Sequence, residues 1–512
     1  MNNRIFVLGI ALMVSACVTN AAFEANWESL SKQPIPEWMK DAKFGVYTHW
    51  SVFSVPAFGG PDYIKNVYGG AKKDAKGAYS HHLETYGSLD KNGYINFVDQ
   101  FTAPKFNADE WVDLMYEAGA RFGGILLVHH DGFCLWDSEH TRWNSMDKGP
   151  KRDVYGEIAT AVRKHDDMKL LATFHHGRTL GYATGFMDKE KGIPVKTEEN
   201  KDWDIWNPEY QDFYWNEGAG AKPEVFAAEW EAKIKEVVDK YSPDCIWFDG
   251  LNTSIRNNAP SEQQVMDTFA YYFNEAEKKG QEVTICNKHA GQFNFPDSFG
   301  FLCYENGREM ALDVKPWYLI DRAIAYPWSY VTDKKYKDGP DYHIKSLIDL
   351  VSRGGVFLLS LTPKGDGSIP DEEIAIMKGM GRWMKVNAEA IHATRPWKIS
   401  GEGPAVMLEY NAVKKRDDWN YRQPFIAQDI RFTVSKDGKT LYATALNWPE
   451  NGKIVVKSLA EGSEYYPGKI GSVEMVGLNE PVKWIRTAEG LEITFPKDKP
   501  ADWEWAYAFR IR

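Results

Sequence analysis

The sequence predicts an α/β fold, a (β/α)8 barrel of the TIM type followed by a C-terminal antiparallel β-sandwich. The 512 residues exceed what one compact core usually holds and suffice for a large barrel with a smaller second domain. Strand-like apolar runs alternate with amphipathic helical segments between residues 40 and 390, which is typical of a parallel sheet with crossover helices. After Trp397 short strands separated by turn residues indicate antiparallel sheets.

Eight apolar segments are predicted to be the barrel strands. They are Phe44–Trp50, Phe122–His130, Leu170–His176, Cys245–Gly250, Val283–His289, Phe299–Asn306, Tyr326–Val331 and Val356–Pro363. Among the helices between them, Asn107 and Glu110 form a capping pair before a helix that Gly119 closes. Apolar stripes at helical spacing begin at Phe226 and Val265 and are predicted to be core.

The C-terminal domain is predicted to span residues 397–512, after a catalytic barrel at 23–396. Its expected strands are Thr440–Leu446, Gly452–Val456, Glu492–Phe495 and the aromatic alternation of Trp503–Tyr507. These segments are short and bounded by turn residues, so a small β-sandwich is the natural interpretation.

Residues 1–22 are predicted to be a targeting segment outside the fold. Arg4 precedes the apolar run Ile5–Val14, which is too short to span a bilayer stably. Because the run ends in Val14-Ser15-Ala16-Cys17, like a bacterial lipobox, we expect lipidation of Cys17. The protein would then be exported to the periplasm or outer membrane of a Gram-negative bacterium. Cleavage near Ala21 or Ala22 is the soluble alternative.

Composition and motifs exclude several classes of function. A net charge of -11 disfavours nucleic acid or an anionic membrane surface as the main partner. There is no Gly-rich phosphate loop after any predicted strand and no Gly-x-Ser-x-Gly elbow, so we expect neither a nucleotide cofactor nor acyl-transfer chemistry. The four remaining cysteines lie in or beside apolar segments without metal-type spacing and are expected to be buried free thiols.

Polar residues concentrate where the predicted strands end, which is where parallel barrels carry their reacting groups. Six of the 12 histidines lie there: His49, His129, His130, His175, His176 and His289. They are joined by the carboxylates Asp131, Asp249 and Glu305. One titratable site is therefore predicted at the carboxyl ends of the strands.

Asp249 is the predicted nucleophile of this site. It ends the apolar segment Cys245–Phe248, and Gly250 lets the chain turn away at once. An aspartate before glycine can also simply cap a turn. If Asp249 acts as the nucleophile of a retaining glycosidase, a second carboxyl group is needed within about 5 Å of it. Glu305 and Glu309 are the candidates, and Glu305 is preferred because it ends a strand directly.

The adjacent residues His129, His130 and Asp131 also suggest a metal site. Adjacent strand residues point to opposite faces, so strand geometry brings only one of the two histidines easily into the site. No His-Glu-x-x-His helix is present. We therefore favour histidines that bind sugar hydroxyls and expect no metal.

Taken together, the motifs resemble glycoside hydrolase family 29, the α-L-fucosidases, over nearly the whole mature chain. The resemblance runs through residues 38–50, 129–138, 147–153, 247–250, 358–370 and 387–397. It implies a retaining mechanism without metal, Asp249 at the nucleophile position, and contacts of His49, His129 and His130 with the fucose hydroxyls. The other predicted substrate-binding residues are Trp50, His175, His176, His289 and Trp328.

The chain departs from the family pattern around the nucleophile. It has Pro61-Asp62-Tyr63 where a Glu-Trp-Tyr segment is usual, Phe174-His175-His176 where Tyr-Tyr-Ser is common, and His289 where arginine is often found. Trp328-Ser329 replaces a Trp-Glu pair. Because His175, His176 and Arg178 suit an anion, we expect a sulfated or branched fucosylated glycan such as fucoidan. An endo-acting fucan hydrolase and an inactive glycan-binding lipoprotein are the alternatives.

Overall fold

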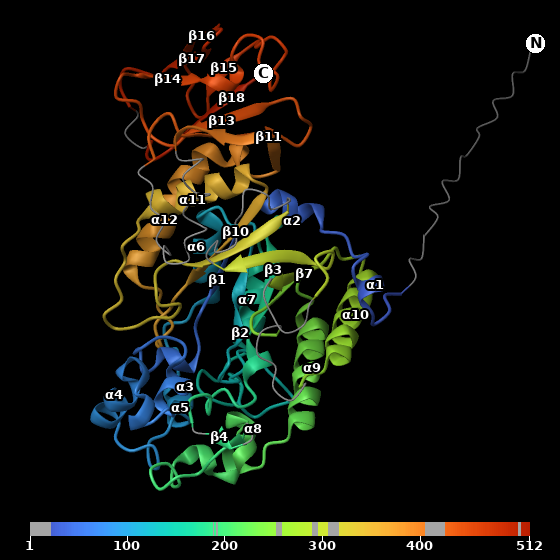
Figure 1. Ribbon diagram of the computed structural model, residues 1–512, viewed down its shortest axis with the longest axis vertical. Helices are drawn as coiled ribbons and strands as arrows, with labels where there is room; N and C mark the ends of the chain where they lie inside the picture. Colours follow the sequence, from blue (N-terminus) through green and yellow to red (C-terminus); the bar gives the residue numbers. More distant parts are fainter. Residues whose placement is uncertain are drawn as a thin grey trace, which may run out of the picture.

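A computed structural model describes residues 22–187, 189–190, 193–251, 259–288, 295–305, 317–404, 425–499 and 503–512. Eight parallel strands close into a barrel in the order β1-β10-β9-β8-β7-β6-β3-β2 (Figure 1). They are β1 Phe44–Thr48, β2 Phe122–Val128, β3 Lys169–Phe174, β6 Cys245–Phe248, β7 Thr284–Lys288, β8 Phe301–Glu305, β9 Tyr318–Ala323 and β10 Gly355–Leu361. The predicted fold class is confirmed.

The barrel strands are buried on both faces, as parallel strands covered by helices must be. Every residue of β1, β2 and β10 is buried. The interior holds Tyr47, Trp247 and three cysteines, Cys245, Cys286 and Cys303. All four cysteines in the described part of the chain are buried and free, as the sequence predicted.

Helices form the outer layer of the barrel. The long ones are α6 Ala108–Glu117, α7 Val154–Val162, α9 Pro223–Tyr241, α10 Glu262–Lys278, α11 Pro340–Ser352 and α12 Asp371–Asn387. The predicted cap of α6 is present, because the Asn107 side chain accepts hydrogen bonds from the backbone N–H groups of Asp109 and Glu110. The stripes that begin at Phe226 and Val265 face the core, as predicted.

The predicted seventh strand, Tyr326–Val331, is wrong. The strand at that place in the barrel is β9, Tyr318–Ala323, and residues 326–331 follow it as irregular chain. Pro327 has no N–H group to give to a neighbouring strand, which disfavours a central position in a sheet. Asp321 and Arg322 interrupt the apolar run that would have marked β9 in the sequence.

Two antiparallel sheets form the C-terminal domain, as predicted. One has the order β11-β12-β13-β18-β15 and the other β14-β17-β16. Their strands are β11 Thr394–Glu402, β12 Ile430–Ser435, β13 Leu441–Ala445, β14 Lys453–Val456, β15 Val473–Met475, β16 Lys483–Thr487, β17 Gly490–Thr494 and β18 Tyr507–Ile511. The last strand begins where the predicted aromatic alternation ends, and the first begins at Thr394.

Short elements extend the barrel at the carboxyl ends of its strands. They are α3 Tyr63–Val67, α4 Ala78–Thr85, α5 Asn96–Gln100, β4 Lys189–Glu190, β5 Ile193–Pro194 and α8 Gln211–Tyr214, while α1 Trp27–Leu30 and α2 Glu37–Ala42 precede the first strand. Figure 1 shows α4, α5, β4 and α8 at one end of the molecule and the C-terminal sheets at the other, beyond α11 and α12.

The predicted targeting segment and Cys17 lie outside the described residues. Among the helices that the structure does describe, none is both long and apolar enough to cross a bilayer.

Candidate active site

The carboxyl ends of the barrel strands bring titratable side chains from five strands together. His49 directly follows β1, His130 lies two residues beyond β2, and His175 directly follows β3. Asp249 directly follows β6, and Glu305 is the last residue of β8. In a parallel barrel these ends converge on one face, which is the usual place for a catalytic site.

Four histidines form a compact group at this face, which we call the histidine cluster: His49, His129, His130 and His175. The ring centroids of His129 and His130 are 4.4 Å apart, and that of His175 lies 5.1 to 5.5 Å from the other three. All four side chains are buried. The adjacent residues His129 and His130 both enter the cluster because β2 has already ended at Val128.

Hydrogen bonds fix the tautomers of two of these rings. His130 Nδ1 lies against the backbone carbonyl oxygen of His175, which can only accept, so Nδ1 carries the proton. His49 Nδ1 lies 2.8 Å from the hydroxyl of Ser360, which itself donates to the carbonyl of Leu361, so His49 Nδ1 is the donor there. In both rings Nε2 therefore keeps a lone pair that can accept a hydrogen bond.

The histidine cluster is uncharged at neutral pH. Burial lowers the pKa of His49, His129 and His175 well below the usual range, because the charged form loses its hydration. Burial also lowers the pKa of His130 to about 3, although Asp249 opposes the shift. Nδ1 of His129 and both ring nitrogens of His175 have no hydrogen-bond partner among the described residues.

Asp249 is held as an anion beside the cluster. Its Oδ1 atom lies 3.0 Å from Lys288 Nζ, and its Oδ2 atom lies 3.8 Å from His175 Nδ1 and 3.9 Å from His130 Nε2. Burial disfavours the carboxylate, but Lys288, His175 and His130 together outweigh that penalty, and the pKa of Asp249 stays well below its usual range. The carboxylate is therefore ionised.

The second predicted carboxylate is linked to Asp249 by the same cation. Glu305 Oε2 lies 3.3 Å from Lys288 Nζ. Both groups contact one ammonium nitrogen, which brings these two carboxylate oxygens close enough to be compatible with the roughly 5 Å spacing of a retaining glycosidase. Glu309, the alternative acid, and the predicted ligand His289 lie outside the described residues.

The structure does not bring Trp50 and His176 into this group. Trp50 is fully buried among Phe101, Phe106 and Trp111, so its ring belongs to the hydrophobic core. His176 packs against Phe174 and Trp230 on the outer side of β3, because it lies next to His175 and points the other way. A sugar bound near Asp249 would not reach either ring.

Trp328 does lie at the histidine cluster. Its ring centroid is 5.0 Å from that of His49, although the residue comes from the irregular chain after β9. Lys334 holds this segment in place, since its ammonium group donates to the backbone carbonyls of Pro327 and Ser329. Trp328 is thus one of the aromatic side chains beside the imidazoles at the mouth of the barrel, together with Tyr182 and Phe53.

Two overlapping sets of side chains have the atoms for a metal site. His49, His129 and His175 form one set, and His130, His175 and Asp249 form the other, with ligand atoms within 4.8 Å of one another in each. Such sets fit zinc or another transition metal. The positive charge of Lys288 beside Asp249 already balances that carboxylate and acts against a second cation there.

A cationic rim lies next to the cluster: Lys65, Lys76 and Arg178. Arg178 packs against the residue after the nucleophile, because a Cβ atom on Gly250 would lie 2.0 Å from Arg178 Cδ. The tyrosine hydroxyl of Tyr182 donates to Asp62, and its ring lies 4.6 Å from that of His130.

The surroundings of Lys65 indicate that the three cations of the rim lie close together. Its ammonium group sits 5.5 Å from the Tyr182 ring centroid. Burial lowers the pKa of Lys65, Arg178 and Lys76 lower it further, and Asp62 opposes the shift. Asp62 is the acid that faces these cations, and it also accepts the Tyr182 hydroxyl.

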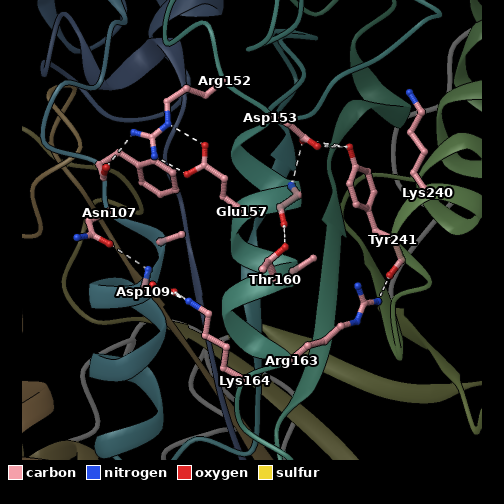
Figure 2. A pocket seen from close by; sticks show the side chains of 14 residues that line it. Asn107, Asp109, Arg152, Asp153, Glu157, Thr160, Arg163, Lys164, Lys240 and Tyr241 are labelled. Atoms are coloured by element: carbon pink, nitrogen blue, oxygen red, sulfur yellow. Dashed lines mark hydrogen bonds and ion pairs between the residues drawn. The ribbon is translucent and has the colours of Figure 1, made fainter.

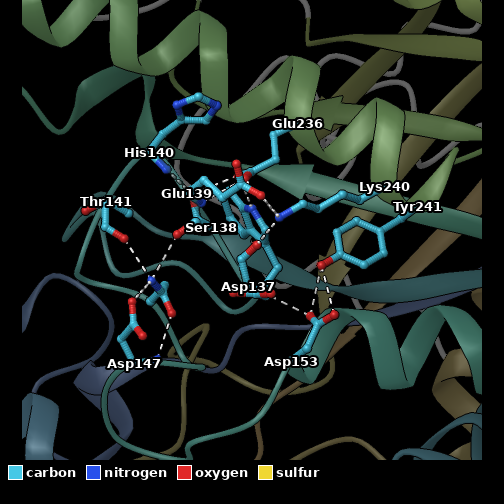
Figure 3. Close-up of polar contacts among 12 residues, drawn as sticks. Asp137, Ser138, Glu139, His140, Thr141, Asp147, Asp153, Glu236, Lys240 and Tyr241 are labelled. Carbon is cyan, nitrogen blue, oxygen red and sulfur yellow. Dashed lines mark hydrogen bonds and ion pairs between the residues drawn. The ribbon is translucent and has the colours of Figure 1, made fainter.

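Two of the segments that resemble the family, residues 129–138 and 147–153, contribute side chains that stabilise the scaffold and do not enter the site. Figure 3 shows the loop after β2 held against α9 by Glu236, whose carboxylate accepts hydrogen bonds from Trp136 Nε1, Ser138 Oγ and the backbone of Glu139. Asp153 accepts from the hydroxyl of Tyr241 in the same region. These residues fix the loop that follows His130.

A groove on the outer face of the barrel is lined by charged residues that already pair with one another. It lies along α6, α7 and the end of α9 (Figure 2). Arg152 pairs with Glu157, Lys164 lies 2.6 Å from Asp109, and Arg163 donates to the carbonyl of Tyr241. Because these charges are balanced, the groove offers less to a ligand than the barrel mouth does.

Sequence reasoning missed two residues of the site. Lys288 is neither a histidine nor a carboxylate, the residue types that mark this site in the sequence, although it lies at the end of the correctly predicted fifth strand. Asp321 was missed because its strand was placed too late in the chain. It is buried in β9, with Oδ2 3.9 Å from Lys288 Nζ.

Comparison with known proteins defines the class. The family model for alpha-L-fucosidase matches residues 10–389, and the model for the alpha-L-fucosidase C-terminal domain matches residues 423–512. The chain therefore belongs to the α-L-fucosidase family and is a glycoside hydrolase.

Individual relatives match over nearly their whole length. The tissue alpha-L-fucosidase of Homo sapiens is 28% identical over 515 residues, covering 99% of this chain and 94% of that protein. The plasma enzyme of Rattus norvegicus is 28% identical over 516 residues, covering 96% and 95%. The crystal structure of Thermotoga maritima alpha-fucosidase with a mechanism-based inhibitor has a TM-score of 0.70 at 25% identity, covering 96% of this chain and 99% of that one.

Proposed function

We propose that the protein is a retaining exo-α-L-fucosidase in which Asp249 is the nucleophile and Glu305 the acid and base. One observation carries the proposal: carboxylates from two neighbouring regions of the barrel, after β6 and on β8, contact the same ammonium group beside four uncharged imidazoles. Retaining glycosidases need this pair of closely spaced carboxyl groups.

The reaction has two steps. In the first, Asp249 Oδ2 attacks the anomeric carbon while Glu305 gives its proton to the leaving oxygen, so that the glycosidic bond breaks and a fucosyl ester forms. In the second, Glu305 takes a proton from water, and the hydroxide oxygen displaces Asp249 at the same carbon. Fucose leaves with its original anomeric configuration, and both carboxyl groups return to their starting states.

The histidine cluster supplies hydroxyl recognition. Nε2 of His49 and of His130 can each accept a hydrogen bond from a sugar hydroxyl, because the Nδ1 proton of each ring is engaged elsewhere. The unpartnered ring nitrogens of His175 can donate one bond and accept another. A neutral deoxy-sugar with several hydroxyl groups fits such a set of donors and acceptors.

The finer substrate proposal concerns the group next to the scissile fucose. The cationic rim of Lys65, Lys76 and Arg178 faces Asp62, in a chain whose net charge is -11. Nε of Arg178 is buried without a hydrogen-bond partner in that same part. A sulfate ester or carboxylate on the glycan suits these cations, so sulfated fucosylated glycans such as fucoidan are the proposed substrates.

The nucleophile is tested by Asp249→Ala. Turnover of 4-nitrophenyl α-L-fucoside should disappear while the folded protein remains, and a 2-fluoro-fucosyl fluoride should leave a stable adduct on Asp249 of the wild-type protein. Asp437→Ala, on the surface of the β-sandwich, serves as the matched control. Activity that survives in Asp249→Ala would refute the assignment, and sugar binding without turnover in the wild type would favour the inactive glycan-binding alternative.

The substrate class is tested by comparing kcat/KM for 4-nitrophenyl α-L-fucoside with that for sulfated and desulfated fucan oligosaccharides, and for a uronate-bearing oligosaccharide. We expect preference for the anionic glycans, and its loss in Lys65→Met. A strong preference for the plain glycoside would refute the proposal. Release of oligosaccharides instead of free fucose would identify endo action.

We also propose that the protein is exported and anchored to a membrane through a lipid on Cys17. The proposal rests on the charged start, the short apolar run and the Val14-Ser15-Ala16-Cys17 sequence. Mass spectrometry of the mature N-terminus tests it, because a free N-terminus near Ala21 or Ala22 would refute the anchor.

A further inference from the structure

Lys288 occupies the centre of a group of carboxyl groups that come from three barrel strands. It ends β7, and in the barrel β7 lies between β6 and β8. Its Nζ atom lies 3.0 Å from Asp249, 3.3 Å from Glu305 and 3.9 Å from Asp321. The neighbouring strands thus place the two reacting carboxyl groups on either side of one cation.

The lysine is held rigidly and remains charged. Its side chain is 12% exposed, and Nζ lies 4.8 Å from the centroid of the Trp247 ring. Burial alone would lower the pKa of Lys288, but Asp249, Asp321 and Glu305 outweigh burial and raise it. Lysine therefore stays an ammonium ion at any pH where the enzyme works.

The ammonium group also distinguishes the two oxygens of Asp249. Oδ1 contacts Lys288, whereas Oδ2 faces His130 and His175 across 3.9 and 3.8 Å. The imidazoles are the groups proposed to bind the sugar, so Oδ2 is the oxygen that faces the anomeric carbon. Lys288 thereby sets which oxygen attacks.

We propose that Lys288 is a positioning residue that serves as the shared counter-ion of both halves of the double displacement. This inference rests on the proposed roles of Asp249 and Glu305. Before attack Lys288 pairs with ionised Asp249, while Glu305 holds the proton that it will donate.

When the fucosyl ester forms, Asp249 becomes neutral and Glu305, having given its proton to the leaving oxygen, becomes the carboxylate. The negative charge has moved from one neighbour of Lys288 to the other, and it moves back when water is deprotonated. Each step therefore keeps one anion beside the cation, and the buried site gains no net charge.

Asp321 completes the group without competing for this role. Burial raises the pKa of Asp321, and the neighbouring Glu305 and Asp249 raise it further against the opposing effect of Lys288. Below the raised pKa of about 7, protonated Asp321 leaves the Lys288 charge to the two reacting carboxyl groups. The hydrogen bond from Cys303 Sγ to Asp321, at 3.5 Å, fixes its side chain in the barrel interior.

The test is the pH dependence of kcat/KM in Lys288→Met, which removes the charge and keeps the length of the side chain. The acid limb should move up by about 1–3 pH units, because Asp249 loses the cation that favours its ionised form. At the optimum, kcat/KM should fall about 100-fold. The other titratable groups that face Asp249 and Lys288 are unchanged in this variant: His49, Tyr47, His130, His175, Cys303, Glu305 and Asp321.

Lys288→Arg should restore most of the acid limb, because it keeps a cation, whereas Lys288→Gln should behave like Lys288→Met. Lys453→Met, on the β-sandwich surface, is the control for general effects of losing a lysine. An unshifted acid limb in a folded Lys288→Met variant overturns the inference.

The wild-type profile gives a test that needs no variant. With Asp249 held by Lys288, the acid limb of kcat/KM should lie below the ordinary aspartate pKa of about 3.9. A limb at or above that value in protein shown to be folded overturns the inference. These results are separate from the proposed function, which fails if Asp249→Ala keeps its activity or if the wild type binds the sugar without turnover.

Discussion

Two groups of buried polar side chains, one at each end of the barrel, differ in how their hydrogen bonds are satisfied. At the end that joins the β-sandwich, the fully buried Arg431 side chain pairs with Asp349, which also lies 3.1 Å from Arg353. Arg395 lies 2.7 Å from Asp41 on α2. At the other end, the buried ring nitrogens of His175 have no partner in the described structure.

This difference distinguishes side chains that stabilise the fold from side chains that are available to a ligand. A buried polar atom without a hydrogen bond costs about 1–3 kcal/mol, so several of them gathered in one cluster call for an explanation. The paired charges of the junction complete the fold by themselves. The imidazoles of the mouth are open to a ligand, as the proposed binding of sugar hydroxyls requires.

The largest expected effect is at the junction. Asp349→Ala leaves two arginines without their shared partner, one of them fully buried, and should lower the free energy of unfolding by about 3–5 kcal/mol. Urea denaturation measures the loss. The kcat/KM of the folded fraction should stay at the wild-type value, because the junction is remote from Asp249. A drop in kcat/KM without a drop in stability would reverse the contrast between the two ends.

The same pair predicts a pH dependence of stability in the wild type. The arginine charges hold the pKa of Asp349 below its usual value, although burial opposes them. A carboxyl group with a lowered pKa contributes stability that is complete above its unfolded pKa of about 3.9 and is lost as the pH falls below it. Unfolding experiments between pH 3 and 6, chosen to bracket about that value, should show this loss in the wild type and a weaker one in Asp349→Ala.

For the histidine cluster at the mouth we expect the opposite result, a loss of activity without a loss of stability. His175→Phe removes two unpartnered buried nitrogens, so stability should stay the same or rise, while loss of one or two hydrogen bonds to the sugar should lower kcat/KM by about 10-fold to 100-fold. Thermal unfolding and steady-state kinetics measure the two effects. His165→Phe is the matched control, because that ring stacks on Tyr116 outside the mouth. A destabilised His175→Phe variant with normal kinetics would make His175 a core residue.

The fold could be predicted because its signals are local and repeated. Parallel strands buried on both faces are continuous apolar runs, and Phe122–Val128 and Gly355–Leu361 are of this kind. The site could be predicted in outline because a parallel barrel collects the residues that follow its strands. Four of the six histidines chosen on that ground form the histidine cluster, and Asp249 and Glu305 share Lys288.

The rest depends on side-chain direction and long-range pairing, which the sequence does not encode locally. Trp50 and His176 follow strands like their neighbours but turn into the core and toward the outer helices. Asp321 and Arg322 interrupt the apolar pattern of strand β9, so the sequence alone does not indicate this strand. In the barrel Asp321 lies beside Lys288, which accounts for a charged residue at that position. Such charges are recognisable only once the neighbouring strands are known.

The smallest expected effect concerns the segment that carries Trp328. Lys334 donates to the carbonyls of Pro327 and Ser329, so Lys334→Met should loosen Trp328 and raise KM about 3-fold with little change in kcat, since one hydrogen-bonded support is worth about 1 kcal/mol. Lys335→Met, an exposed neighbour, is the matched control. An unchanged KM would mean that packing against His49 alone holds the indole.

Burial lowers the pKa of Lys334 to about 8, so raising the pH of the wild-type protein removes the same charge as Lys334→Met does. A lowered lysine pKa means that the charge is present at neutral pH and is lost as the pH rises through that value. Above pH 8 or so the wild-type KM should therefore rise toward that of Lys334→Met, whose own KM stays flat there. If KM rises in parallel in both proteins, the group that titrates lies elsewhere at the mouth. If the two KM values converge, the charge on Lys334, and not only its bulk, keeps the indole of Trp328 beside the histidine cluster.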